Sequence, residues 1–361
     1  MTGDLVAVEL LRVRLPLKRP FTTSFGSSAD KDCLLVRAIG SDGAEGWGEC
    51  TAMEVPLYSG EWNDGAWLIL RDHLIPAALT GRPSGIRGHP MAGAALEVAL
   101  LDLELRSKGV SLAEHLGGVR DRVPCGVSVG IEDRIDDLLE LVSGFVTAGY
   151  RRVKLKVEPG RDVPVVRAVR EAFPDTPLSV DANAAYTGET AEALLELDDL
   201  GLEYVEQPLP EDDLLGHIEL QRRMATPLCL DETITSARVA RGAIELEACR
   251  VINVKLGRVG GLAESLLIHE VGRDAGVPLW VGGMLETGVG RAANVALASL
   301  PGFTLPGDTS ASERYFESDL TEPFAVDADG TMRVPDGPGL GVTPLPDRLE
   351  SAVVDRVTVR P

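Results

Sequence analysis

The sequence predicts an α/β protein in which a TIM-type barrel of parallel strands follows a smaller α+β domain. The first observation is that, from about residue 123, eight short apolar runs alternate with segments of helical length. Such alternation is typical of parallel βα units, and eight of them indicate a barrel. The second is that five of these runs end on a charged residue at nearly constant spacing. An open doubly wound sheet is the alternative, but no GxGxxG or Walker loop follows the first strands.

Residues 1–120 have the mixed character of an α+β domain. The expected strands are residues 4–15, 32–39 and 44–50. Turn residues in SDGAEGWGEC join the last two as a hairpin. Helices are expected at 62–79 and 90–108. The second is apolar on more than one face and is followed by Gly109, a common C-cap, so we expect it to pack on both sides at a domain interface.

The barrel is expected over residues 121–319. Its strands are predicted at residues 123–130, 152–157, 177–183, 203–208, 227–233, 250–256, 278–284 and 303–308. The remaining segment, 320–361, is rich in Pro and Gly and closes with the strand-like VVDRVTV. It is too irregular to be another barrel unit, so we expect it to return to the N-terminal domain.

Composition excludes several classes of function. The 361 residues carry a net charge of −21 with a pI near 4.7, which argues against binding of nucleic acid or of anionic membrane surfaces. Five cysteines without a CxxC pair argue against a disulfide framework or a zinc site. The N-terminus lacks a signal-peptide pattern, and no apolar run of about 18 residues occurs. We therefore expect a cytoplasmic, reduced protein.

The run RVKLKV at 152–157 has an unusual pattern for a strand. Its apolar residues alternate with Arg152, Lys154 and Lys156. The chain has 35 basic residues but only six lysines, namely Lys18, Lys31, Lys108, Lys154, Lys156 and Lys255. Lysine can lose its proton when its pKa is lowered, whereas arginine effectively cannot. Two lysines on one strand face therefore indicate a functional site, with an ordinary solvent-exposed face as the alternative.

Charged residues close five successive runs. Lys156, Asp181, Glu206 and Asp231 are each 25 residues apart, and Lys255 follows 24 residues later. Because the carboxyl ends of parallel barrel strands share one rim, we expect these five side chains around one pocket. A single acid here would be an ordinary helix N-cap. Three acids in consecutive units, flanked by lysines, instead predict a site for a hard cation, Mg²⁺ or Mn²⁺, with the remaining positions filled by water or by a substrate carboxylate.

Lysines on both sides of a metal-bound carboxylate suggest abstraction of the proton on the adjacent carbon. Lys154 and Lys156 lie roughly 7 Å apart on one strand face. Their repulsion and a nearby metal ion are expected to lower the pKa of a lysine, while the acids oppose this lowering. A pKa moved toward about 7–8 suits a general base. We predict that Lys156 is this base and that Lys154 tunes it and helps to hold the substrate. Lys255 is predicted to remain cationic on the opposite side.

These motifs resemble the muconate-lactonising subgroup of the enolase superfamily. The resemblance rests on KLK (154–156), DAN (181–183), EQP (206–208), DET (231–233) and NVKLGRVGG (253–261). It implies a modified (β/α)7β barrel with an N-terminal capping domain that the C-terminal segment completes. The implied Mg²⁺ ligands are Asp181, Glu206 and Asp231. The implied acid–base pair is Lys156 and Lys255, with Lys154 as a helper and Asn183 as a substrate contact.

Within the subgroup, the chain is most similar to o-succinylbenzoate synthases that also act as N-succinylamino acid racemases. This likeness rests on PFTTSFG (20–26), PLYSGEWNDG (56–65), GGMLETGVGRAAN (282–294) and LPGDTSAS (305–312). It implies substrate contacts at Phe21, Ser24, Met53, Tyr58, Gly283, Met284 and Leu285. For Met53 and Tyr58 the alternative is packing at the domain interface. Arg258 is similar to an arginine found where racemase activity accompanies the synthase, with a solvent-facing loop charge as the alternative.

The resemblance implies a Mg²⁺-dependent dehydratase of menaquinone synthesis. Its substrate would be 2-succinyl-6-hydroxy-2,4-cyclohexadiene-1-carboxylate. N-succinylamino acid racemisation as the main or second activity is one alternative, and a non-catalytic barrel that binds carboxylates is another. Branches with a histidine base or a DxD motif near the last strand fit less well, because no histidine closes a barrel strand and LPGDTSAS has one Asp. We expect a homo-oligomer.

Overall fold

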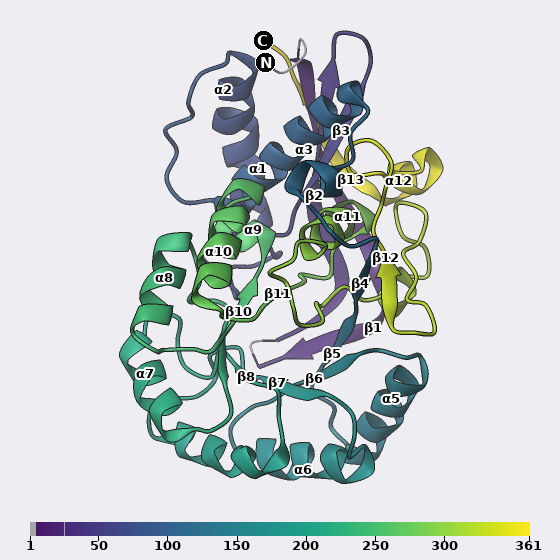
Figure 1. Ribbon diagram of the computed structural model, residues 1–361. Helices are drawn as coiled ribbons and strands as arrows, with labels where there is room; N and C mark the ends of the chain where they lie inside the picture. Colours follow the sequence, from purple (N-terminus) through teal and green to yellow (C-terminus); the bar gives the residue numbers. More distant parts are fainter. Residues whose placement is uncertain (1–4, 25) are drawn as a thin grey trace.

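The computed structural model describes residues 5–24 and 26–361 (Figure 1). Asp4 of the first expected strand and Phe25 of PFTTSFG lie outside the described residues. An antiparallel sheet near the two chain ends has the order β13-β1-β2-β3. Its strands are β1 (Leu5–Thr23), β2 (Gly26–Gly40), β3 (Glu45–Cys50) and β13 (Val353–Val359). The C-terminal strand therefore completes the N-terminal sheet, as expected. We call the part formed by residues 5–24, 26–117 and β13 the cap.

The cap helices follow the sheet in sequence. They are α1 (Asn63–Ile69), the π-helical turn η1 (Leu70–Leu74), α2 (Ile75–Leu79), α3 (Pro90–Lys108) and α4 (Leu112–Leu116). The helix expected at 62–79 thus exists, with a π turn in its middle. Helix α3 has the predicted bounds and ends at Gly109, whose φ of 69° places it in the left-handed region that favours glycine.

Helix α3 packs on both sides, as its apolar pattern predicts. Ala95 and Ala99 belong to a core shared with the cap sheet. Ala94 and Val98 belong to the larger core that includes the barrel. The approach to β3 is close enough that a Cβ on Gly48 would lie 2.0 Å from the Ala95 carbonyl oxygen. Glycine is therefore required at this crossing, which fixes the cap sheet against α3 and, through α3, against the barrel.

The second sheet has seven parallel strands in sequence order, β5 to β11. They are β5 (Gly126–Val129), β6 (Arg152–Lys156), β7 (Leu178–Asp181), β8 (Val205–Glu206), β9 (Leu228–Leu230), β10 (Val251–Val254) and β11 (Leu279–Val281). The run expected as an eighth strand, 303–308, is not a regular strand. It closes the barrel through isolated parallel bridges between Leu279 and Phe303 and between Cys125 and Gly307. Pro306 has no N–H to donate, which interrupts a continuous ladder.

Helices cover the outside of these strands, as Figure 1 shows for α5 to α8. They are α5 (Ile135–Thr147), α6 (Asp162–Ala172), the 3₁₀ helix η2 (Thr190–Leu200), α7 (Leu214–Arg223), α8 (Ala237–Glu245), α9 (Leu256–Val259), α10 (Leu262–Ala275) and α11 (Gly288–Ala298). After them come η3 (Ser312–Arg314) and α12 (Pro346–Ala352). The run 123–130 is split, because β4 (Arg122–Pro124) pairs with β12 (Thr331–Arg333) outside the barrel. The predicted fold class, a modified barrel with a cap that the C-terminal segment completes, is confirmed.

Within the residues that the structure describes, every helix is too short or too polar to cross a lipid bilayer.

Candidate active site

The charged face of β6 points into the barrel. Lys154 is only 1% exposed, and its Nζ lies 2.6 Å from Glu206, 2.9 Å from Asp308 and 3.2 Å from Asp181. Arg152, on the same face, is also buried and forms an ion pair with Asp308 at 2.8 Å. The alternative of a solvent-exposed strand face is therefore wrong. Both faces of RVKLKV are buried, one against helices and one against acidic partners inside the barrel.

Parallel register aligns the first strand ends of the predicted set. Lys156 pairs with Asp181 across β6 and β7, and Asp181 pairs with Glu206 across β7 and β8. The Lys156 Nζ donates to Asp181 Oδ2 at 2.7 Å and to Asn183 Oδ1 at 2.6 Å. Glu206 is fully buried and accepts a hydrogen bond from Asn253 Nδ2 at 2.7 Å. The constant spacing in the sequence thus becomes adjacency at one rim of the barrel.

The other end of the set gathers around Asp231. The Lys255 Nζ donates to Asp231 Oδ2 at 2.8 Å, and the Tyr58 hydroxyl donates to Asp231 Oδ1 at 3.2 Å. Arg258 is 4% exposed, forms an ion pair with Asp231 and donates to the Tyr58 hydroxyl at 3.1 Å. Its remaining contacts are to backbone carbonyl oxygens of Ile234 and Asn253. Arg258 is therefore a buried support of Asp231, and the alternative of a solvent-facing charge is wrong.

For Lys154, the surrounding carboxylates oppose the lowering of the pKa that is expected from Lys154–Lys156 repulsion. Burial lowers its pKa, but the carboxylates of Asp308, Glu206 and Asp181 outweigh burial and raise the pKa well above its usual value. Burial also opposes the charge on Lys255, yet Tyr58 and the acidic neighbours Glu232 and Glu206 raise its pKa. The sequence indicated that acids would oppose the repulsion between the lysines, but it did not indicate how many carboxylates would surround each lysine.

The pKa values of the acidic residues are also shifted by burial and by the neighbouring charges. Burial disfavours ionisation of Asp181, but the ammonium groups of Lys156 and Lys154 outweigh burial and hold its pKa below the usual range. Glu206 differs, because burial and the charge of Asp181 raise its pKa. Burial likewise raises the pKa of Glu232 to about 7. This buried group of carboxylates is therefore stabilised by added positive charge.

The residues present suit a divalent cation in their chemistry. Asp181 and Glu206 close β7 and β8, and Asp231 directly follows β9, so the three offer oxygen ligands at neighbouring strand ends, as a hard ion prefers. In residues 5–24 and 26–361, no three acidic, His or Cys side chains are arranged as a ready metal cluster. Instead, an ammonium group lies against each of the three carboxylates of Asp181, Glu206 and Asp231. A bound cation would compete with these lysines for the same oxygens.

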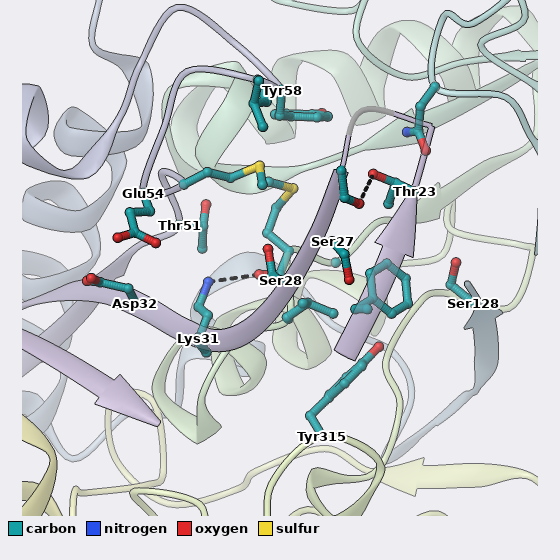
Figure 2. Close-up of a pocket in the computed structure, with 18 of the residues that line it drawn as sticks. Thr23, Ser27, Ser28, Lys31, Asp32, Thr51, Glu54, Tyr58, Ser128 and Tyr315 are labelled. Carbon is teal, nitrogen blue, oxygen red and sulfur yellow. Dashed lines mark hydrogen bonds between the residues drawn. The ribbon is translucent and has the colours of Figure 1, made fainter. Parts of the chain in front are cut away.

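A cavity of about 380 Å³ lies between the cap and the barrel rim (Figure 2). Its barrel side includes Lys154, Lys156, Asp181, Asn183, Lys255, Gly283, Met284 and Leu285, and its cap side includes Phe21, Met53 and Tyr58. Glu206, Asp231 and Arg258 are buried beneath this lining. Ser24 contacts the barrel through a 3.4 Å hydrogen bond to the Ala182 carbonyl oxygen. The cavity therefore brings most of the predicted substrate-binding residues together around Lys156 and Lys255.

Models of two protein families match the chain in succession. The model described as mandelate racemase / muconate lactonizing enzyme, N-terminal domain, matches residues 6–117. The model described as enolase C-terminal domain-like matches residues 137–348. The chain belongs to the mandelate racemase/muconate lactonizing enzyme family of the enolase superfamily. The resemblance inferred from the strand-end motifs is thus confirmed.

Relatives in this family are similar over nearly the whole chain. An N-succinylamino acid racemase from an Amycolatopsis species is 54% identical, covering 98% of this chain and 99% of the relative. An o-succinylbenzoate synthase from Geobacillus kaustophilus is 48% identical, covering 94% of each. The crystal structure of an enolase superfamily member from Listeria innocua is 38% identical with a TM-score of 0.93, covering 99% of each chain. The family assignment therefore applies to both the cap and the barrel.

Sequence reasoning missed two residues of the site in this family member. Asp308 closes the run 303–308 and pairs with Lys154 and Arg152, so the strand-end argument could have found it. It was overlooked because it breaks the 25-residue spacing. Lys31 of the cap also lines the cavity. Its only sequence signal was the scarcity of lysine, because nothing local in KDCLLV indicates a position beside the barrel.

Proposed function

We propose that the chain is an o-succinylbenzoate synthase that dehydrates 2-succinyl-6-hydroxy-2,4-cyclohexadiene-1-carboxylate in menaquinone synthesis. The observation that carries the proposal is the placement of Lys156 and Lys255. Both line one cavity, and their ammonium groups bind carboxylates two strands apart on either side of Glu206. A planar substrate held above Glu206 would have one lysine facing each side. The relatives named o-succinylbenzoate synthase support this choice of substrate.

We infer that Asp181, Glu206 and Asp231 hold a divalent cation, Mg²⁺ or alternatively Mn²⁺. When bound, this cation supplies positive charge that stabilises the negative charge developing on the substrate carboxylate. Their oxygens and burial fit this role.

Lys156 is assigned the proton transfers. Its Nζ borders the cavity and is oriented by Asp181 and Asn183. In the neutral form it removes the proton on the carbon next to the substrate carboxylate, and the resulting ammonium then protonates the hydroxyl that departs from the same face. Lys255, kept protonated by its neighbours, faces the other side and steadies the negative charge of the intermediate. Lys154 is assigned to hold the substrate carboxylate and to balance the charge of Glu206.

N-succinylamino acid racemisation is the second candidate activity. It begins with the same proton abstraction, after which the lysine on the opposite face returns a proton, so that the two lysines alternate as base and acid. Arg258 favours this activity because it is buried against Asp231 and Tyr58, and both of these residues also contact Lys255 and help to fix its position. The relative named N-succinylamino acid racemase supports it as well.

Deuterium exchange separates these activities from a barrel that only binds carboxylates. The enzyme with Mg²⁺ is incubated in deuterium oxide with an N-succinyl amino acid, and separately with the dehydration substrate. We expect deuterium at the α-carbon in the first case and o-succinylbenzoate in the second. Absence of both would reject the enzymatic proposal, and comparison of kcat/KM for the two substrates identifies the preferred reaction. A cytoplasmic location and a homo-oligomeric state remain proposals from the sequence.

A further inference from the structure

Lys31 is a fourth lysine of the cavity, and it has no part in the proposed proton transfers or in the proposed substrate contact of Lys154. The chain has only six lysines among 35 basic residues. Four of them, Lys31, Lys154, Lys156 and Lys255, line this cavity. Lys31 comes from β2 of the cap and is 6% exposed. A buried ammonium group loses its hydration and needs defined partners, so those partners indicate what it does.

The partners of Lys31 lie on both sides of the domain boundary. Its Nζ donates a 2.8 Å hydrogen bond to the backbone carbonyl oxygen of Met284 in the barrel (Figure 2). It also lies 3.8 Å from Glu49 Oε1, on β3 of the cap. Met284 is in the turn that follows β11, between Gly283 and Leu285, and all three residues line the cavity. Lys31 thus joins the cap directly to a wall of the cavity.

This turn has a backbone conformation that requires support. Leu285 has a φ of 56°, in the left-handed region that non-glycine residues rarely adopt. Inside the turn, the Met284 N–H donates to Glu286 Oε1 at 2.8 Å, and the Met284 carbonyl oxygen accepts from Lys31. Gly282, the residue before the turn, lies so close to Lys255 that a Cβ on Gly282 would be 2.7 Å from Lys255 Cγ. Movement of the turn would therefore move the cavity wall beside the proposed second lysine.

Glu49 holds the far end of the same segment. Its carboxylate is fully buried and accepts hydrogen bonds from the Thr287 hydroxyl at 2.6 Å, the Thr287 N–H at 3.1 Å and the Gly290 N–H at 3.0 Å. These groups form the start of α11, where a carboxylate is favourable. A Cβ on Gly290 would lie 2.9 Å from Glu49 Oε2, so a larger residue there would displace this carboxylate. Two neighbouring strands of the cap thereby hold both ends of segment 284–290.

We propose that Lys31 is a positioning residue that fixes the turn Gly283–Leu285 through the Met284 carbonyl oxygen, and that it thereby sets the size of substrate side chain that the cavity accepts. The inference deepens the second candidate activity, N-succinylamino acid racemisation, because the substrates of that reaction differ in their side chains. The Lys31 Nζ acts from the cap onto the wall of the cavity, while the proton transfers stay with Lys156 and Lys255.

The test compares three variants of the full-length protein. Lys31→Met keeps the length of the side chain and removes the donor, and Lys31→Gln keeps a donor without the charge. Lys108→Met alters an exposed cap lysine at the end of α3 and is the control. For each, kcat and KM are measured with N-succinylalanine and N-succinylphenylalanine. Amide hydrogen exchange of segment 283–290 is followed as a readout that is independent of catalysis.

For Lys31→Met we expect KM to rise about tenfold and kcat to change by less than about threefold, since a hydrogen bond from a charged donor to the turn is lost. The ratio of kcat/KM between the two substrates should change by about fivefold or more, and exchange in 283–290 should accelerate about tenfold. Lys31→Gln should lie between the wild type and Lys31→Met, and Lys108→Met should match the wild type.

Three results would overturn the inference. One is an unchanged substrate ratio together with unchanged exchange in 283–290. Another is a large loss of kcat at constant KM, which would place Lys31 in the chemistry. The third is an equal effect from Lys108→Met. If Lys31→Met does not fold, Lys31→Gln decides by the same criteria. If the wild type acts on neither N-succinyl amino acid but exchange still responds to Lys31→Met, the proposed racemisation and the effect on side-chain size fail, and the positioning role of Lys31 stands.

Discussion

Tyr58 of the cap lies over Lys255 of the barrel, with the Lys255 ammonium 4.4 Å from the centroid of the tyrosine ring. The hydroxyl of the same tyrosine donates to Asp231, which also binds that ammonium group. A cation above an aromatic face is stabilised by the ring, most strongly where water is excluded. The cap thus contributes to the electrostatics of the site as well as covering it.

Two substitutions of Tyr58 should distinguish the contribution of its ring to activity from that of its hydroxyl. Tyr58→Phe keeps the ring over Lys255 and loses the hydrogen bond to Asp231, so we expect kcat/KM to fall about threefold to tenfold. Tyr58→Ala removes both and should lower kcat/KM by about a hundredfold. Steady-state kinetics with both substrates measures these effects. Equal losses for the two variants would show that the ring contributes nothing.

Lys156→Ala should abolish dehydration and racemisation together. Loss of a general base costs about 10²–10⁴-fold in rate, and we propose that Lys156 begins both reactions. Binding of Mg²⁺, measured by titration calorimetry, should persist because Asp181, Glu206 and Asp231 are unchanged. Lys108→Ala, on the exposed surface of the cap, is the control. Substantial residual turnover by Lys156→Ala would contradict the assignment of the base.

Removal of divalent cations should eliminate both activities reversibly. Chelation is expected to leave the fold intact, because the lysines already pair with the carboxylates. Added Mg²⁺ should restore turnover and raise the melting temperature, since a ligand that binds only the folded state stabilises it. Activity that survives exhaustive chelation would contradict the proposed cation site.

Asp308 should make the free energy of unfolding depend on pH in the acidic range. Burial opposes its ionisation, but Lys154 and Arg152 outweigh burial and lower its pKa. A group whose pKa is lowered by folding stabilises the fold above its unfolded pKa of about 3.9, and this contribution is lost as pH falls toward the folded value. The free energy of unfolding, measured with denaturant from pH 6 to pH 2, should therefore decrease below about pH 4.

Asp308→Asn should flatten that decrease and lower the free energy of unfolding at pH 7 by about 3–5 kcal/mol, because two buried cations lose their anionic partner. Asp72→Asn breaks an exposed ion pair with Arg71 and is the matched control, for which no measurable change is expected. An unaltered acid dependence in Asp308→Asn would show that other carboxylates carry it.

Gly48→Ala should weaken the packing of the cap sheet on α3. The added Cβ would lie 2.0 Å from the Ala95 carbonyl oxygen, so the strand or the helix must shift. We expect a loss of about 1–3 kcal/mol in the free energy of unfolding, visible as a lower melting temperature. Gly93→Ala on α3 has open space around it and should be stabilising by about 0.5–1 kcal/mol. A Gly48→Ala variant as stable as the wild type would contradict the close approach.

Most of the barrel and its rim could be predicted from the sequence, because both depend on local repetition. Parallel strands of constant spacing bring their last residues to one edge, so Lys156, Asp181, Glu206, Asp231 and Lys255 could be grouped by counting. The two-sided apolar pattern of residues 90–108 predicted a helix between two cores. The prediction of a regular eighth strand at 303–308 was wrong because Pro306 interrupts it, although this segment still closes the barrel.

The sequence by itself determined which side chains would meet at the rim, since a β-strand has a fixed direction and a fixed period. Only the tertiary structure decided which charged groups surround these side chains and which residues support them. Lys154 meets three carboxylates from three other segments, which reverses the pKa shift expected from its neighbour on the strand. The contacts of Lys31 with Met284 and of Arg258 with Tyr58 join residues about 200 or more positions apart. Such contacts depend on how the cap docks on the barrel, and no local pattern encodes that docking.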